Sequence, residues 1–248
     1  MSAVKAIHAL TAPVEDYLKT IYEIEGAGSG TTSPGVAGTN EIAQVLGIAP
    51  ASVTGMLRRL AEQGLISYER YRGVRLTEAG RRAALRTIRR HRVIEAYLAK
   101  ALGYPWDRVH QEAEELEHAA SDELIDRMAS AIGEPTTDPH GAPIPTREGI
   151  LDVPDLVSLA DVAVGEVVRI RQVGDRDPER LRYLGELGIT PGADVRVTAR
   201  APFDGPITLH IVRQAGMRVR ALRADRERAI GPALAAQIFV EARRKREA

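Results

Sequence analysis

Four ligand-type side chains stand at helical spacing in the acidic segment VHQEAEELEHAASDEL. They occupy positions i, i+4, i+7 and i+8 and are His110, Glu114, Glu117 and His118. Residues at this spacing share one face of a helix. The neighbouring stripe is apolar and consists of Val109, Ala113, Leu116 and Ala120. Imidazole and carboxylate groups beside a buried face are suited to holding a divalent cation. We therefore expect a metal-binding helix here, from about Trp106 to Ile132.

A second pair of ligand-type residues, His91 and Glu95, stands one turn apart in the preceding predicted helix, which runs from near Thr77 to Leu102. Two antiparallel helices would bring all of these side chains into one groove. The chain has no cysteine, so only nitrogen and oxygen atoms could hold the metal. Such ligands favour manganese, or else ferrous iron, although intrinsic affinity favours zinc or copper. The alternative is a solvated acidic face, to which we assign Glu112, Glu115, Asp122, Glu123 and Asp126.

The charges are segregated along a chain whose formal net charge is zero. Residues 1–102 carry 14 Lys and Arg against 9 Asp and Glu, residues 103–163 carry 3 against 14, and residues 164–248 carry 17 against 11. Eleven arginines lie between residues 50 and 92. This basic N-terminal block is typical of a surface that faces nucleic-acid phosphates. The alternative is an ordinary arginine-rich surface.

The basic block has the pattern of a helix-turn-helix with a wing. A short helix with Asn40 as its cap ends at Gly47, and a second begins at Pro50 and ends at Gly64. The next segment, LISYERYRGVRLTEAG, alternates apolar and polar residues around its Arg-Gly pair, as a hairpin does. Helix, turn, helix and hairpin in this order indicate DNA binding.

Seven residues of this block are predicted to contact DNA. The second short helix offers small and hydroxyl side chains toward base edges and arginines toward phosphates, and the hairpin adds two further arginines. The residues are Ser52, Thr54, Gly55, Arg58, Arg59, Arg70 and Arg72.

We expect a mainly α-helical protein with small β parts. A winged helix-turn-helix domain is predicted over residues 1–80, with a first helix over Pro13–Glu25, and a helical dimerisation and metal-binding domain over 81–143. Residues 144–160 form a linker within the proline- and glycine-rich segment DPHGAPIPTREGILDVPD. Short β-like segments such as VGEVVRIRQV and GPITLHIV predict a small barrel over 161–241.

Composition limits the setting of the protein. The absence of cysteine excludes disulfides and cysteine nucleophiles and fits the cytosol. The N-terminus MSAVKAIHALTAPVED has no basic start followed by an apolar run, and no stretch approaches the ~20 apolar residues that span a bilayer. We expect a cytoplasmic protein without membrane contact.

Over nearly its whole length, the sequence resembles the diphtheria toxin repressor family of metal-dependent regulators, particularly the manganese-responsive members. The segments that carry the resemblance are VEDYLKTIYEIE, IAPASVTGMLRRLAEQGLISYERYRGVRLTEAG, RRHRVIEAYLAKALGYPWDRVHQEAEELEHAASDEL and DPHGAPIP. The resemblance implies a C-terminal SH3-like domain of the ferrous transport protein A type. It also implies a homodimer that binds double-stranded operator DNA and represses metal-uptake genes.

The resemblance divides the ligands between two sites. Asp16, Glu114, Glu117 and His118 match a primary site, and His91, Glu95 and His110 match an ancillary one; Asp16 is added by the resemblance alone. Iron-responsive members have methionine and cysteine where this chain has Asp16 and Glu114, which implies manganese. Lys19 replaces a glutamate of the short manganese regulators, which leaves the number of metals per subunit open. Glu179 is the candidate for a ligand from the SH3-like domain.

Other classes of function fit parts of the pattern. A metallohydrolase would use Glu114, Glu117 and His118 with a bound water, but no separate general base or substrate motif accompanies them, so we expect no enzyme. A winged-helix regulator that senses a small organic ligand would leave the histidines structural. The prediction is a manganese-dependent transcriptional repressor, with an iron-responsive regulator of the same family as the alternative.

Overall fold

The computed structural model describes residues 10–27, 35–69, 73–174, 176–213 and 227–241. The chain divides into two compact units. One comprises the residues up to Arg90 together with Pro145–Leu151, and the other comprises His91–Ile144 together with the residues from Asp152 onward. The predicted domain boundaries at residues 80, 143 and 160 stay predictions. Within the described ranges, no helix combines the length and the apolar character needed to cross a membrane.

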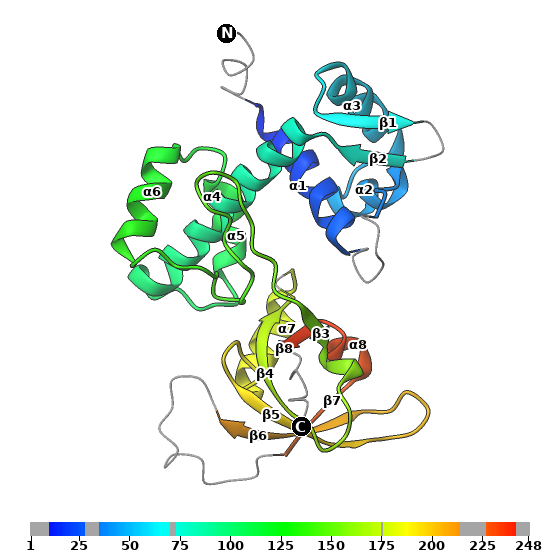
Figure 1. Cartoon of the computed structure of the whole chain (residues 1–248), viewed down its shortest axis with the longest axis vertical. Helices are drawn as coiled ribbons and strands as arrows, with labels where there is room; N and C mark the ends of the chain where they lie inside the picture. The colour runs from blue at the N-terminus through cyan, green and yellow to red at the C-terminus, as the bar shows by residue number, and fades with distance from the viewer. Residues whose placement is uncertain (1–9, 28–34, 70–72, 175, 214–226, 242–248) are drawn as a thin grey trace, which may run out of the picture. The chain divides into compact units, whose positions relative to one another are not determined.

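The first unit contains a helix-turn-helix followed by a two-stranded hairpin (Figure 1). Its elements are α1 (Ala12–Ala27), α2 (Thr39–Leu46), α3 (Pro50–Glu62), β1 (Ile66–Glu69) and β2 (Gly73–Leu76). The strands pair antiparallel, with Ile66 opposite Leu76. The fully buried side chains that hold these helices together include Leu18, Ile21, Ile42, Val53, Leu57 and Leu60. The predicted winged helix-turn-helix is confirmed.

Local signals build the turn between α2 and α3. Gly47 ends α2 with a positive φ of 66°, and Pro50 stands in the first turn of α3, where its missing N–H breaks no helical bond. The cap predicted at Asn40 is wrong, because α2 begins at Thr39 and the extended residue Gly38 takes the cap position. Asn40 therefore lies inside the first turn.

The continuous helix predicted from about Trp106 to Ile132 is also wrong. The long helix α4 (Glu78–Leu102) is followed by two shorter ones, α5 (Val109–Leu116) and α6 (Asp122–Ala131). After α5 the chain turns tightly, with the N–H groups of Ala119 and Ala120 both donating to the carbonyl of Leu116 at 3.1 Å. The Ser121 hydroxyl then caps α6 by accepting from the N–H of Leu124 at 3.3 Å. This turn leaves Leu116, predicted as core, 43% exposed.

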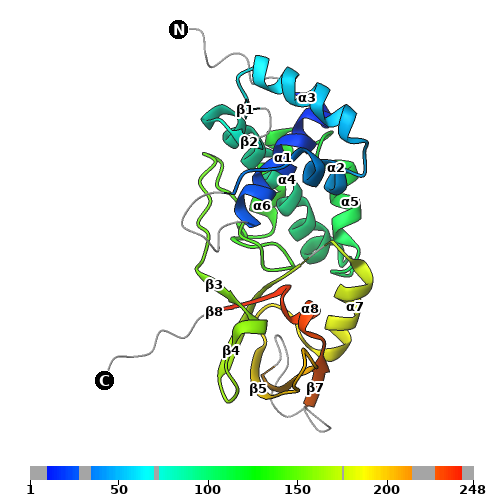
Figure 2. The same cartoon turned by 90° about the vertical axis from the view of Figure 1, so that its right-hand side faces the viewer.

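The described residues from 156 to 241 form what we call the β-domain (Figure 2). Its strands are β3 (Leu156–Ser158), β4 (Val167–Val173), β5 (Asp194–Arg200), β6 (Ile207–Arg213), β7 (Glu227–Ile230) and β8 (Ile238–Glu241). Its helices are η1 (Leu159–Asp161), α7 (Pro178–Leu187) and α8 (Pro232–Ala235). The antiparallel strands follow the order β3-β8-β4-β5-β6-β7. Among the described residues, β3 and β7 each pair on one side only, so the predicted small β-domain is present but its sheet does not close into a barrel.

The segment DPHGAPIP, which begins the proline- and glycine-rich stretch that contains the predicted linker, is packed against the protein. Thr137 and Pro143 form a β-bridge. Between them, Asp138 is 5% exposed and His140 is fully buried. We call residues 137–144 the DPHG loop. Its buried polar side chains must find partners, because burial of an unpaired polar group is costly.

Candidate metal centre and DNA-binding surface

Two helices and the turn after α5 position the predicted ligands of the second unit. His91 and Glu95 lie one turn apart on α4, and His110 and Glu114 lie one turn apart on α5. Glu117 and His118 follow α5 directly. Packing of Val93, Ile94, Val109 and Ala113 in one apolar core holds the helices together. The structure thus brings these six predicted ligands into a connected set of contacts.

Three ligand atoms converge at the centre of this set. Nε2 of His91 lies 3.1 Å from Oε1 of Glu95 and 3.0 Å from Nδ1 of His110. Nδ1 of His110 lies 3.2 Å from Oε1 of Glu95. Nδ1 of His91 contacts Oε2 of Glu117 at 2.6 Å, and since a carboxylate only accepts, this nitrogen carries a proton. The three atoms at the centre are thus one carboxylate oxygen and two ring nitrogens. Such convergence requires shared protons or a cation, and an ion with bonds of about 2.1 Å places adjacent ligand atoms about 3 Å apart.

Glu114, Glu117 and His118 surround this centre, and with His91 and His110 they form what we call the outer cluster. Oε1 of Glu114 is 3.7 Å from Nδ1 of His91 and from Nε2 of His110. Nε2 of His118 is 3.5 Å from Oε1 of Glu117. Glu117 is fully buried, whereas the side chain of Glu114 is 41% exposed. The outer cluster is therefore closed on the Glu117 side and accessible at Glu114.

Two further ligand-type residues come from the DPHG loop and were missed by the sequence analysis. Asp138 and His140 gather with Glu95 into a buried group that could hold a metal ion, which we call the inner cluster. Nδ1 of His140 is 3.8 Å from Oε1 of Glu95. Oδ1 of Asp138 accepts from the N–H groups of His140 at 2.8 Å and Ala142 at 3.0 Å. The signal in the sequence was an Asp and a His two residues apart in the proline- and glycine-rich segment that precedes the predicted linker.

The surroundings of the inner cluster favour the charged forms of Glu95 and His140. Burial alone would raise the pKa of Glu95, but hydrogen bonds from His110 and His91 and the nearby ring of His140 hold this pKa well below its usual range. Burial likewise opposes the charged form of His140, but Glu95, whose Oε1 lies 3.8 Å from Nδ1, and the charge of Asp138 raise the pKa of His140 to about 9. His140 and Arg92, whose Nε lies 3.7 Å from Oδ2 of Asp138, therefore compensate the charge of the two carboxylates.

The donor set of the inner cluster fits a bound cation. Among the residues that the structure describes, neither Oε2 of Glu95 nor Nδ1 of His140 has a hydrogen-bond partner, although both atoms are buried. Buried polar atoms are almost always satisfied, and exceptions commonly mark a missing ion or water. Carboxylates and imidazole without sulfur suit a hard or borderline divalent cation. Glu95 contacts both clusters, which makes it the central ligand candidate.

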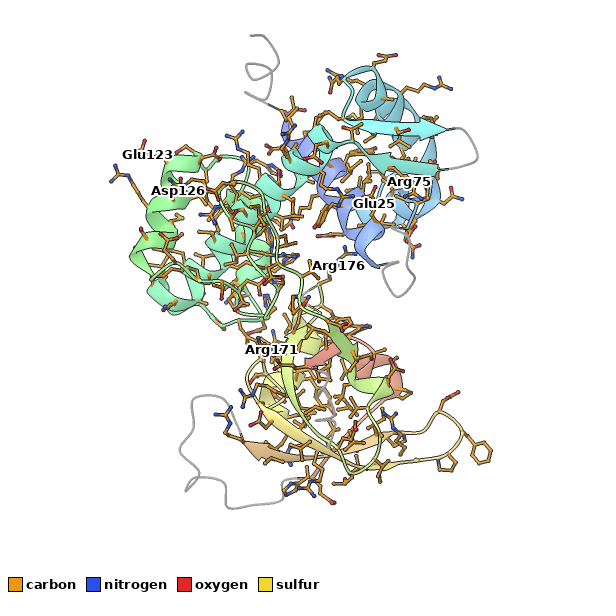
Figure 3. All side chains as sticks on the ribbon, viewed as in Figure 1. Glu25, Arg75, Glu123, Asp126, Arg171 and Arg176 are labelled. Carbon is orange, nitrogen blue, oxygen red and sulfur yellow. The ribbon has the colours of Figure 1, made fainter. Side chains whose placement is uncertain are left out.

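Asp16, Lys19 and Glu179 belong to other elements of the chain. Asp16 is a half-buried residue of α1 in the first unit, and its place in the ligand set stays a prediction. Lys19, on the same helix, is 9% exposed. Glu179 is an exposed residue in the first turn of α7. Glu123 and Asp126, which we assign to a solvated face, lie on α6 (Figure 3). Glu123 forms an exposed ion pair with Arg127 at 2.8 Å.

The face of α3 opposite its buried stripe carries most of the predicted DNA contacts. Val53, Leu57 and Leu60 are buried. The opposite face exposes Ser52, Gly55, Arg58 and Arg59, and the half-buried Thr54 donates its hydroxyl to the carbonyl of Pro50 at 3.2 Å. Arg70 and Arg72 lie outside the described residues. This surface has the side chains that a recognition helix requires.

A helix-turn-helix with an exposed polar recognition face, followed by helices that bring together buried His91, Glu95 and Glu117, defines a DNA-binding protein with a metal site. Models of the iron-dependent repressor family match the chain in succession. The N-terminal DNA-binding domain matches residues 9–74, the metal-binding and dimerisation domain matches residues 77–146, and the FeoA domain matches residues 157–242. The chain belongs to this diphtheria toxin repressor family of metal-dependent transcriptional repressors.

Similar proteins include both iron- and manganese-dependent repressors. The iron-dependent repressor IdeR of Mycobacterium tuberculosis is 32% identical over 217 residues, which cover 83% of this chain and 91% of that protein. The solved structure of a manganese-dependent transcriptional repressor in complex with manganese is 36% identical, with a TM-score of 0.79 over 92% of this chain and 99% of that one. ScaR with bound Zn²⁺ is 29% identical, with a TM-score of 0.73 over 92% of this chain and 98% of that one. The similarities therefore agree on metal dependence but differ in the metal.

Proposed function

We propose that this chain is a manganese-responsive repressor, which binds operator DNA as a homodimer in the cytoplasm and controls metal-uptake genes. The observation that carries the proposal is the sulfur-free set of carboxylates and imidazoles in the inner and outer clusters. Such ligands favour Mn²⁺ or Fe²⁺. The protein is proposed to bind and release a metal rather than to catalyse a reaction, as expected for a transcriptional regulator.

The two clusters have distinct parts in this proposal. Glu95, Asp138 and His140 would hold a cation in a buried environment, where the cation would take the place of the proton on His140. Glu114, Glu117 and His118, with His91 and His110, would hold a cation at a more accessible place. Asp16 would add a carboxylate to the second set, as the family resemblance implies. The metal supplies positive charge and fixes the orientation of its ligands.

The DNA side of the proposal rests on α3. Ser52, Thr54 and Gly55 would lie against base edges, while Arg58 and Arg59 would contact phosphates, as would Arg70 and Arg72 of the hairpin. In a dimer, two such helices would enter successive major grooves. Since metal acts only through a difference in affinity between states, metal and DNA must strengthen each other by the same factor.

The test is a titration of a labelled promoter fragment from a metal-uptake gene with the protein in Mn²⁺, in Fe²⁺ without oxygen, in Zn²⁺ and in chelator. We expect Mn²⁺ to give the tightest binding. Glu95→Gln should abolish the metal response, whereas Glu123→Gln, an exposed change on α6, should leave it intact. Equal DNA affinity in Mn²⁺ and in chelator would refute the proposal.

The second candidate is an iron-responsive repressor, which the similarity to IdeR favours. The same titration separates the two, because a response that is strongest with Fe²⁺ supports the iron-responsive function. The carboxylate at Glu114 predicts the manganese outcome, since a harder ligand favours Mn²⁺ over softer ions.

A further inference from the structure

We propose that the β-domain sets the metal affinity of the inner cluster by holding His140 in place, with Trp106 and Gly141 as the positioning residues. The inference rests on the proposed metal site at Glu95, Asp138 and His140. It adds a role for residues that themselves donate no ligand atom.

The ring of His140 is fixed by the main chain of Trp106. Nε2 of His140 lies 2.7 Å from the carbonyl oxygen of Trp106, and a carbonyl only accepts, so Nε2 carries a proton. The other ring nitrogen, Nδ1, is the atom near Glu95. The indole of Trp106 also stacks on the imidazole, with the ring centroids 5.8 Å apart and the planes inclined by 30°. The ring is therefore held with Nδ1 toward the inner cluster. The partner of the second ring nitrogen commonly orients metal-binding histidines in this way.

The main chain of the same residue is held by β4. The carbonyl of His140 accepts from the N–H of Val173 at 2.9 Å. The next residue, Gly141, has a φ of +91°, and a Cβ atom there would lie 1.8 Å from the carbonyl oxygen of Arg171. Only glycine allows this approach, so the DPHG loop lies directly against β4.

The indole makes the third connection. Trp106 packs against the apolar core of the β-domain, and a Cβ atom on Gly185 of α7 would lie 3.1 Å from Nε1 of Trp106. The neighbouring Asp107 pairs with Arg182 of α7 at 3.2 Å. A shift of β4 or of α7 would therefore move the loop or the ring that presents Nδ1. Conversely, a cation bound by His140 would stabilise these contacts, because the two events are thermodynamically linked.

The test compares two glycine variants by calorimetric titration of the metal-free full-length protein with Mn²⁺. Gly141→Ala would force the loop away from β4. Gly133→Ala is the matched control, since Gly133 has a similar φ of +84° but no atom within 4 Å of an added Cβ. We expect Gly141→Ala to weaken inner-cluster binding by about tenfold or more, a typical effect of losing a partner of a ligand, and Gly133→Ala to leave it unchanged.

Gly185→Ala provides a second variant, because alanine is favourable within a helix and the three atoms nearest to the added Cβ all belong to Trp106. We expect weaker Mn²⁺ binding and altered fluorescence of Trp106, the single tryptophan of the chain. A readout independent of affinity is amide hydrogen exchange in α7, which Mn²⁺ should slow in the unsubstituted protein but not in Gly141→Ala. A purely structural role of these glycines would not produce this difference.

His140→Ala separates the failure of this inference from the failure of the metal site. If His140→Ala retains the tight Mn²⁺ site, the inner cluster is not a metal site and the inference falls with it. If His140→Ala loses the site while Gly141→Ala and Gly185→Ala bind Mn²⁺ as Gly133→Ala does, the metal site stands and the positioning role is refuted.

Discussion

Metal binding at the inner cluster is expected to release about one proton near neutral pH, because His140 holds a proton that the cation must displace. The pKa of His140 is raised to about 9 by the proximity of Glu95 and by the charges of Glu95 and Asp138, against the opposing effect of burial. At pH 7.5 the imidazole of the metal-free protein is thus almost fully protonated. Binding through Nδ1 requires its neutral form.

The magnitude follows from the size of this shift. A rise from 6.5 to about 9 corresponds to roughly 3 kcal/mol. Because the folded pKa is the higher one, this stabilisation of the metal-free protein is complete below pH 6.5 and is lost as the pH rises through 9. The Mn²⁺ affinity should fall about tenfold for each pH unit as the pH is lowered from 8.5 to 7, because the cation must displace the proton.

The assay is calorimetric titration with Mn²⁺ at pH 7.5 in two buffers that differ in their enthalpy of ionisation. The measured quantity is the difference in proton release between the unsubstituted protein and His140→Asn. His210→Asn, a half-buried change on β6, is the control and should release as many protons as the unsubstituted protein. Equal proton release from His140→Asn and the unsubstituted protein would refute the assignment of the charge to His140.

Three further changes test other parts of the molecule. Glu114→Cys should shift the metal response from Mn²⁺ toward softer ions such as Zn²⁺ in the DNA-binding titration, and an unchanged order of metals would remove Glu114 from the ligands. Arg58→Gln should lower the slope of log affinity against log salt by about 0.9 for each lost phosphate contact, whereas the exposed Arg127→Gln of α6 should not change it. Leu60→Ala removes a fully buried side chain of α3 and should lower the free energy of unfolding by about 2–5 kcal/mol in urea denaturation; a smaller loss would show that this core is not closely packed.

Local patterns predicted most of the elements and part of the site. The winged helix-turn-helix follows from turn residues and helical spacing, and Gly47 and Pro50 act where the sequence placed them. Spacing of i and i+4 also placed His91 with Glu95 and His110 with Glu114 on single helix faces. These predictions succeeded because they depend on residues at most one turn apart. The open sheet was not predictable in the same way, since strand order depends on contacts between distant segments.

The inner cluster shows the limit of periodicity most clearly. Asp138 and His140 reach Glu95 from a loop that follows α6, and no helical or strand period relates them to it. Their position depends on the β-bridge of the DPHG loop and on its hydrogen bond to β4. Helical spacing can align ligands on one element, but a buried metal site needs ligands from several directions, and the others must come from long-range packing.

The break after α5 also shows that helical spacing alone does not determine which residues are buried. Periodicity predicted that Leu116 is buried and that Glu117 lies on a flanking face, yet Leu116 is 43% exposed and Glu117 is fully buried. The tight turn that ends the helix accompanies this exchange, and Glu117 is held by its short contact with His91. A carboxylate buried at the expense of a leucine is unfavourable unless its charge is paired. The fold therefore leaves a leucine exposed at the place where it buries a proposed metal ligand. Such an exchange is expected where function rather than packing determines which residue is buried.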